Sequence, residues 1–467
     1  MASVPPGEIR LDPWTLTLAH VAWRLRVIAA RIVTLAAIAG ASLGARSESH
    51  LVILSPHNEA IREEFERGFS RWHATHHGEP VDIDWRMVGG SSESIRFVQS
   101  EYARKPDGIG IDVFFGGGQE PYYELAEKRL IDPYRVPAEV LDGLAPDVAG
   151  IELRAPDFAW YGAAISSFGI LQNLRVQKLA HLPSIRRWDD LAKPELKGWV
   201  GAGDPRGSGT MHVMFESFLQ ARGWTDGWSL LARVAGNTRR FDRISSTTAK
   251  DAAVGETAYA LAIDFYAFTQ IAAAGKSNLA FLLPVDFAAV NPDGIAILRG
   301  APHRDLARRF LEYTLSDNGQ KLWLLPQGHP EGPARHSIER MPVRPRLYSA
   351  YRDISNIGPS PFDLPAGFRY DARLAQQRRG VVATLAGAIF VDVHDDLKAA
   401  WNVVIQRGLR PADLAELGRV PITEAEAREL SGQPWRDPSI RHARKTDWQI
   451  WAQKKYQAIA RGRGLEL

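Results

Sequence analysis

The chain has 467 residues, of which 45% are hydrophobic and 24% charged, a composition typical of globular proteins and long enough for up to about three domains. Its formal net charge is only +3, which does not indicate the concentrated basic surface of a nucleic-acid-binding protein, so we expect no nucleic-acid partner. The absence of cysteine excludes disulfides, thiolate metal sites, a cysteine nucleophile and a lipid-anchored cysteine.

Residues 1–48 have the layout of an export signal or N-terminal anchor. Arg24, Arg26 and Arg31 precede the apolar run Ile32–Leu43, and small residues follow it. A charged region, then about a dozen apolar residues, then small residues suited to a cleavage site are typical of export signals. The run is shorter than the roughly 20 residues of a membrane span, but the leader is unusually long, so an uncleaved anchor is the alternative. We predict a periplasmic or otherwise extracytoplasmic protein.

Beyond the leader, short apolar runs alternate with longer amphipathic ones. We expect strands at 51–54, 81–88 and 111–115 and helices at 58–73 and 91–102. After a loop-rich stretch at 131–157, the small and apolar run Trp160–Asn173 is predicted to be an extended crossover. A second series follows, with strands at 198–203, 258–264 and 294–298 and helices at 211–221, 227–234 and 304–314. This alternation predicts an α/β protein whose parallel strands are covered by helices.

Because the chain passes between two such blocks more than once, we predict two lobes around a cleft. The first lobe takes residues 49–163 and is rejoined by 285–343, and the second takes 164–284. Residues 344–467 are predicted to form a mostly helical C-terminal extension, with a capping box from Thr423 to Glu426.

Small and polar turns follow several of these strands, where open parallel sheets bind ligands. The turn GDPRGSGT, Gly203–Thr210, lacks the lysine and the glycine spacing of a phosphate loop. It nevertheless starts a helix at Ser208 or Thr210, and the free N–H groups of a helix N-terminus favour an anion. Gly89–Ser92 repeats this arrangement. We find no base–nucleophile pair, and the one G-x-S-x-G match, Gly40–Gly44, lies in the leader, so we expect no enzyme.

Several segments in order carry a family resemblance: LVILSPHNEAIREEFERGF, IDVFFGGGQ, WYGAAISSFGILQN, DPRGSGT, GETAYALAIDFYA, NPDGIAILRGAPH and LSDNGQKLWLLPQGHPEGP. Over residues 51–348 the chain resembles the solute-binding proteins of bacterial ABC importers, in the branch of the ferric-ion-binding proteins. The resemblance implies the type II periplasmic binding protein fold, with two α/β lobes hinged by crossover strands. It also implies capture of a small solute by cleft closure and delivery to an ABC permease in the cytoplasmic membrane, without catalysis.

The ferric-binding pattern is only partly present. In that branch a histidine after the first strand, a glutamate after the third and two adjacent tyrosines hold the metal. His57 and Tyr266 match the histidine and the second tyrosine, whereas Phe265 and Gly117 replace the first tyrosine and the glutamate. Because ferric iron depends on anionic oxygen ligands, two cargoes stay open: a ferric ion held by His57 and Tyr266, or a small anionic or polar organic solute. No resident cofactor is expected.

We predict that residues in the strand-end turns and the crossover bind the ligand. Two other functions stay open, namely an extracytoplasmic sensor that reports to a membrane partner, and an enzyme on the same fold. The predicted ligand-binding residues are His57, Asn58, Gly90, Ser91, Ser92, Gly117, Ser167, Arg206, Ser208, Gly209, Thr210, Ser246, Asp264 and Tyr266.

Overall fold

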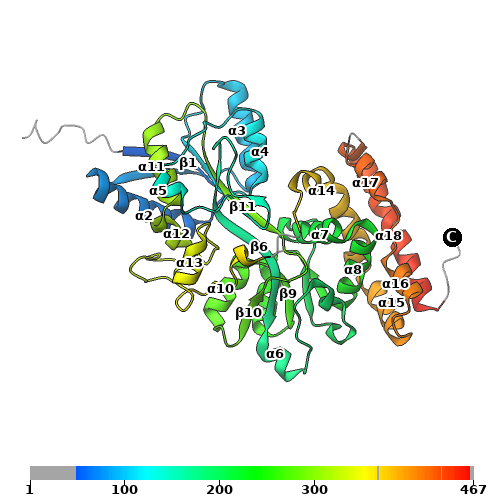
Figure 1. Ribbon diagram of the computed structural model, residues 1–467. Helices are drawn as coiled ribbons and strands as arrows, with labels where there is room; N and C mark the ends of the chain where they lie inside the picture. The colour runs from blue at the N-terminus through cyan, green and yellow to red at the C-terminus, as the bar shows by residue number, and fades with distance from the viewer. Residues whose placement is uncertain (1–48, 244, 365–367, 433, 463–467) are drawn as a thin grey trace, which may run out of the picture. The chain divides into compact units, whose positions relative to one another are not determined.

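The computed structural model describes residues 49–243, 245–364, 368–432 and 434–462. The predicted export signal or anchor, residues 1–48, lies outside them. In the described ranges, no helix is both long and apolar enough to cross a membrane. Residues 50–467 form one structural unit, shown in Figure 1.

The first α/β block follows the predicted order of strands and helices. α2 begins where the Asn58 side chain accepts a hydrogen bond from the Ile61 N–H at 3.1 Å and ends at Gly78, whose φ is +84°. Its apolar face, spaced about four residues apart, is buried at Ile61, Phe65 and Phe69. The elements are β1 (Ser49–Leu54), α2 (Glu59–His77), β2 (Val81–Arg86), α3 (Ser91–Arg104), β3 (Val113–Phe115), α4 (Glu120–Glu127), α5 (Ala138–Leu141), β4 (Asp147–Val148) and β5 (Ile151–Glu152).

A single long strand, β6 (Tyr161–Asn173), joins the two halves of the sheet, as the run of small and apolar residues predicted. Its first half pairs with β11 (Val290–Ile297), up to the register Ser167 with Val290. From Phe168 onward it pairs instead with β9 (Tyr259–Ile263), and with β10 (Leu279–Leu282) further along. The strand order is β2-β1-β3-β11-β6-β9-β7-β8, with β10 also on β6. The chain therefore crosses between the blocks on β6 and returns on β11 (Figure 1).

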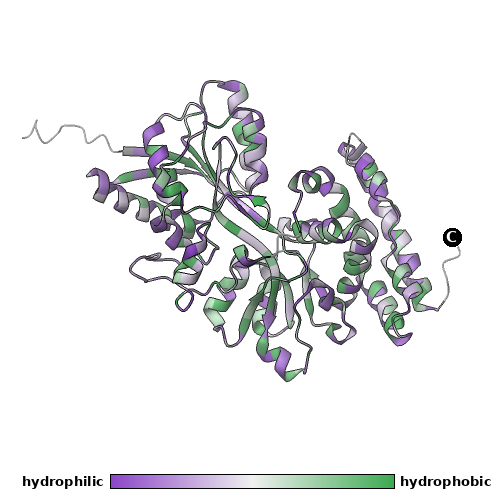
Figure 2. Cartoon of the chain, viewed as in Figure 1, coloured by the Kyte–Doolittle hydropathy of each residue, from purple (hydrophilic) through white to green (hydrophobic). Residues whose placement is uncertain are grey.

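The second block surrounds the far half of β6. Here β7 (Val200–Gly203) pairs in parallel with both β8 (Thr238–Asp242) and β9. Figure 2 shows hydrophobic residues gathered on the central strands, while the surrounding helices also carry hydrophilic ones. The remaining elements are α6 (Leu174–Leu179), α7 (Gly209–Arg222), α8 (Trp224–Asn237), α9 (Ser245–Val254), α10 (Asp264–Ala274), α11 (Arg304–Leu315), α12 (Asp317–Leu324) and α13 (Pro345–Ala350).

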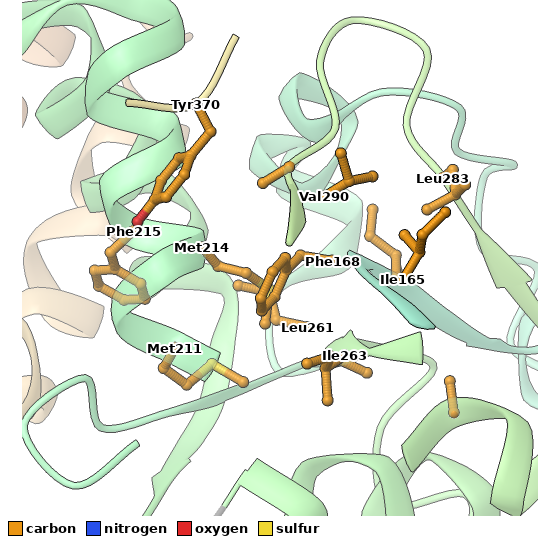
Figure 3. Packing of buried hydrophobic residues seen from close by; sticks show 14 of the residues in the cluster. Ile165, Phe168, Met211, Met214, Phe215, Leu261, Ile263, Leu283, Val290 and Tyr370 are labelled. Carbon is orange, nitrogen blue, oxygen red and sulfur yellow. The ribbon is translucent and has the colours of Figure 1, made fainter. Parts of the chain in front are cut away.

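The core around β6 connects the sheet to the helices that cover it. In Figure 3, Phe168 of β6 lies beside Leu261 of β9 and Met214 of α7, all of which are buried. Tyr370, from the C-terminal extension, belongs to the same buried cluster. The hydrophobic core of the second block thus continues into the C-terminal part of the chain.

The C-terminal extension is helical, as predicted. The Thr423–Glu426 capping box is present, with the Thr423 N–H donating to Glu426 Oε2 at 2.6 Å and the Glu426 N–H to Thr423 Oγ1 at 3.2 Å. Trp448 and Tyr456 of the last helix are buried, because that helix packs on its neighbours in the extension. The helices are α14 (Ala372–Ala386), α15 (His394–Gln406), α16 (Pro411–Gly418), α17 (Glu424–Leu430) and α18 (Pro438–Ala460), with a π-helical turn at Gly387–Val391.

Candidate functional site

A cavity of about 870 Å³ lies where the two blocks face each other across β6 and β11. Its walls come from the carboxyl ends of β1 and β9, from the N-terminal turns of α3, α4 and α7, and from α14 of the extension. Pockets of this volume suit a small organic molecule. The carboxyl ends of the strands therefore face a ligand-sized space, as expected for parallel sheets.

One end of the cavity is built around a buried arginine, Arg340. Its guanidinium donates to Asp293 Oδ2 at 2.6 Å and to Ser166 Oγ at 2.7 Å. His57 Nε2 lies 2.7 Å from the same carboxylate oxygen. Burial opposes ionisation of Asp293, but Arg340 and His57 outweigh it and hold the pKa of that carboxyl well below its usual range. The cluster thus pairs a permanent cation and a histidine with one carboxylate.

Aromatic rings hold the Arg340 guanidinium in place. Its central carbon lies 5.1 Å from the centroid of the Phe265 ring and 5.5 Å from that of Trp323, within the range of a cation–π interaction. Phe265 is the residue that replaces a tyrosine of the ferric-binding pattern. Arg340 NH1 also lies 3.4 Å from His57 Nε2, so a guanidinium stands beside the histidine that the resemblance assigned to iron.

The glycine loop after β3 is fitted closely against this cluster. Gly116 has φ of +101°, and a Cβ there would lie 2.6 Å from His57 Nε2. The Gly118 N–H donates to Asp293 Oδ1 at 2.9 Å, and the Gln119 N–H to Asn291 Oδ1 at 3.1 Å. Two residues of β11, Asn291 and Asp293, therefore bind the loop, and neither is among the predicted site residues. The sequence signal that could have indicated them is the motif NPDG, residues 291–294, in the middle of β11.

The other end of the cavity is formed by the start of α7 and by α14. Gly209, Thr210 and His212 line it from α7. Burial and the nearby Arg379 lower the pKa of His212 to about 3, so this histidine is neutral at physiological pH. The residues of α14 that line the cavity, none of them predicted, are Ala372, Arg373, Gln376, Gln377 and Arg379.

Some of the predicted ligand-binding residues line the cavity and others do not. Those in its wall are His57, Gly90, Ser91, Gly117, Gly209 and Thr210. Those absent from the wall are Asn58, Ser167, Arg206, Ser208, Ser246, Asp264 and Tyr266. The side chain of Ser92 lies outside the described part of the structure.

The residues outside the wall have other partners. Ser208, like Asn58, caps a helix: its hydroxyl accepts from the Met211 N–H at 3.2 Å. Arg206 forms ion pairs with Asp204 and with Asp392 of the extension. Tyr266 packs its ring on that of Phe265, with centroids 4.4 Å apart.

Asp264 and Ser167 are fully buried and lie outside the cavity wall. The Asp264 carboxyl accepts hydrogen bonds from the Ser167 N–H at 2.9 Å and from its own neighbour, the Phe265 N–H, at 2.7 Å. Burial raises the pKa of Asp264 to about 7 despite these contacts and Arg340. The pair joins β6 to the start of α10, and neither residue is part of the cavity wall.

The donor set does not fit a ferric ion well. In the part of the chain that the structure describes, no cluster of three or more His, Cys, Asp or Glu side chains could hold a metal ion. Of the two predicted ligands, His57 lies at the cavity but is bonded to Asp293, and Tyr266 lies outside the wall. The residue beside His57 is a cation rather than a phenolate.

Comparison with known proteins connects this geometry to a family. Residues 110–336 match the family of bacterial extracellular solute-binding proteins. Those residues belong to that family. The prediction of a solute-binding protein with the type II periplasmic binding protein fold is therefore confirmed, and the family implies a location outside the cytoplasmic membrane.

A curated relative and two solved structures extend the comparison. The chain is 29% identical over 294 residues to the phosphoglycerate transport regulatory protein PgtC of Salmonella typhimurium, covering 62% of this chain and 69% of the relative. The apo ferric ion-binding protein A of Pasteurella haemolytica has a TM-score of 0.52 at 15% identity, covering 75% of this chain and 98% of that one. The ferric binding protein of Campylobacter jejuni has a TM-score of 0.51 at 17% identity, covering 72% and 99%. At these identities the structures show a shared fold, and they are all binding proteins.

Proposed function

We propose that this solute-binding protein is the extracytoplasmic component of an ABC importer and that its cargo is a small organic anion. The observation that carries the proposal is the position of Arg340. Its guanidinium is held at the cavity by Asp293, Ser166 and Phe265, beside the histidine of the ferric-binding pattern. A fixed cation in a cavity repels a ferric ion and attracts a carboxylate or phosphate.

The distribution of the other charges supports an anionic cargo. Three of the five carboxylates that line the cavity are in ion pairs: Asp293 with Arg340, Glu93 with Arg96, and Glu124 with Lys128. Glu120 and Glu127 form no ion pair with any residue that the structure describes, and burial raises the pKa of Glu120, which disfavours its charged form. The N-terminal ends of α3, α4 and α7 also lie at the cavity, and helix N-termini favour negative charge. Arg373 and Arg379 of the wall, unpaired in the described part of the chain, act together with these helix ends to favour an anionic group.

The curated relative suggests which anions to test first. Its name connects it with the transport of phosphoglycerate, a molecule with one phosphate and one carboxylate. A cavity of about 870 Å³ has room for a compound of that size. We therefore propose a phosphorylated organic acid as the class of cargo.

The mechanism follows from strands shared by both blocks. His57 and Ser91 reach the cavity from the first block, and Thr210 and Phe265 reach it from the second. A ligand that contacts both walls binds the closed arrangement more tightly than the open one and shifts the population towards it. The bound solute is then presented to a permease in the cytoplasmic membrane.

Titration calorimetry of the purified protein tests this function. The probes are 3-phosphoglycerate, glycerol 3-phosphate, inorganic phosphate and ferric citrate. We expect binding of a phosphorylated probe, and loss of at least about tenfold in affinity in Arg340→Gln, because a hydrogen bond to a charged group contributes about 1.5–3 kcal/mol. Binding of ferric ion alone, unaffected by Arg340→Gln, would overturn the proposal.

A sensory role is the second candidate, because the relative is named a transport regulatory protein and the chain carries a helical extension. The two roles differ in the cell. An importer component is required for uptake of the radiolabelled solute, whereas a sensor is required for the response to the solute but not for its uptake. Uptake measured in a deletion strain, with and without the restored gene, separates them.

A further inference from the structure

The helix α14 of the C-terminal extension forms part of the cavity wall. Arg373, Gln376 and Gln377 line it together with Ala372 and Arg379. Their spacing of three and four residues places them along neighbouring positions of one helix side. The extension therefore presents polar and charged side chains to the same space as His57 and Arg340.

Buried polar contacts hold α14 against α7, whose first turn also lines the cavity. Arg378 donates to Glu216 Oε1 through NH2 at 2.6 Å and through Nε at 2.9 Å, and both side chains are buried. One turn further along α7, the Gln220 side chain accepts from the Asp371 N–H at 2.7 Å and donates to the Asp371 carbonyl at 3.0 Å. Glu216 and Gln220 lie four residues apart and so face the same neighbour. These contacts fix the orientation of α14 relative to the second block (Figure 1).

The two arginines of this wall are free to bind a ligand. Neither the Arg373 nor the Arg379 side chain forms an ion pair or a hydrogen bond with any residue that the structure describes. The Arg379 side chain extends from α14 to the start of α7. Its NH2 atom is 3.4 Å from the position that a Cβ on Gly209 would take. Arg373 lies with its guanidinium carbon 5.7 Å from the ring centroid of Tyr123 on α4. The lining acid Glu120 interacts with Arg379 without an ion pair: burial raises the pKa of Glu120, and the charge of Arg379 opposes that rise.

We propose that α14 is a third wall of the ligand site and that Arg373 and Arg379 bind a second anionic group of the solute. This inference rests on the proposed function. The Arg340 cluster, on the side of β1 and β11, takes one anionic group, and the arginines of α14 take the other. The cargo is thus an acid with two separated anionic groups, and the extension contributes to its selection.

The test compares two probes that differ in one anionic group. 3-Phosphoglycerate carries a phosphate and a carboxylate, whereas glycerol 3-phosphate has a hydroxymethyl group in place of the carboxylate. Affinities are measured by titration calorimetry on the full chain and on R373Q/R379Q. The control variant R352Q removes one positive charge from an exposed arginine outside the cavity wall. Thermal melts confirm that each variant is folded.

We expect the wild type and R352Q to prefer 3-phosphoglycerate by at least tenfold, and R373Q/R379Q to lose that preference while binding glycerol 3-phosphate as before. Equal preference in R373Q/R379Q and wild type would overturn the role of α14 and leave the proposed function standing. If the wild type bound neither phosphorylated probe nor inorganic phosphate, the proposed function itself would fail. Arg378 is unchanged in these variants, so its ion pair with Glu216, which joins α14 to α7, is preserved.

Discussion

Arg340, Asp293 and His57 form a buried charge cluster whose geometry depends on the glycine loop beside it. Gly116 combines φ of +101° with a distance of 2.6 Å from its ideal Cβ position to His57 Nε2. A side chain there would both strain the backbone and displace the imidazole. The identity of this single small residue therefore sets the position of His57.

We predict that Gly116→Ala destabilises the protein more than Gly110→Ala does. Gly110 also has a positive φ, +75°, but no atom lies within 4 Å of the place of its Cβ. The control variant thus incurs only the backbone cost, about 1–2 kcal/mol, and Gly116→Ala incurs the collision with His57 as well. Urea denaturation measures the difference. Equal free energies of unfolding for the two variants would show that the loop can move away from His57.

Asp264 is the second residue with a testable consequence, because burial raises its pKa to about 7, whereas an aspartate in the unfolded chain titrates near 3.9. The folded state therefore disfavours its charged form. Asp264 is protonated in both states below about pH 4, and its contribution to stability falls as the pH rises from about 4 to about 7.

We predict that Asp264→Asn removes this pH dependence. Between pH 5 and pH 7, the free energy of unfolding of the variant should rise relative to the wild type, by at most about 1.4 kcal/mol per pH unit. Urea denaturation at pH 5, 6, 7 and 8 gives the two profiles. Asp293 does not interfere, since its pKa is lowered and its contribution changes only below about pH 4. Parallel profiles for the two proteins would contradict the assignment to Asp264.

The contact between α7 and α14 is the element pairing that brings the extension to the cavity. It depends on the buried ion pair of Arg378 with Glu216, and Arg378 also binds Glu424 of α17. Removing one partner from a buried pair leaves an uncompensated charge in the interior. Helix α7 thus contacts the ligand cavity at its first turn and the extension along its length.

We predict that Arg378→Met lowers the free energy of unfolding by about 3–5 kcal/mol. The double variant Glu216→Gln/Arg378→Met should recover part of that loss, because no charge remains buried. Arg379→Met, the neighbouring exposed position on α14, is the matched control and should change stability by no more than about 0.5 kcal/mol. Chemical denaturation checks all three. If Arg378→Met behaved like Arg379→Met, the ion pair would not be holding the extension in place.

In the proposed mechanism, the two blocks move relative to each other about strands β6 and β11 as the cavity closes. Strand β6 changes its partners between Ser167 and Phe168, close to Ser166 and Phe168 in the cavity wall. Closure around a solute would therefore bend the sheet at the place where the ligand is bound.

We predict that saturating 3-phosphoglycerate both compacts and stabilises the protein. Small-angle scattering should show a lower radius of gyration with the ligand than without it. At a ligand concentration of 100 times the dissociation constant, the free energy of unfolding should rise by about 2.7 kcal/mol. Stabilisation without compaction would indicate binding to one wall only, and the closure mechanism would then be wrong.

Local patterns in the sequence predicted much of the fold. The spacing of Ile61, Phe65 and Phe69 indicated α2, and the run Trp160–Asn173 indicated the strand shared by both halves of the sheet. The turns after the strands predicted the wall residues His57, Ser91, Gly117 and Thr210. These features depend on periodicity and turn chemistry, which are properties of neighbouring residues.

Only the tertiary structure decided which way individual side chains point and which residues far apart in the sequence are in contact. Asp264 follows its strand as predicted, but its carboxylate accepts from the buried Ser167 N–H and is not part of the cavity wall, because β6 pairs with β9 at this point. Arg340 and α14 carry no local signal, since they reach the cavity through contacts with Asp293 and Glu216 that lie far away in the chain. The sequence therefore predicted two α/β blocks, a crossover strand and a cleft at the strand ends, where the cavity lies. The charge of the cavity was decided by long-range contacts, because electrostatics depends on distances in space that sequence neighbours do not specify.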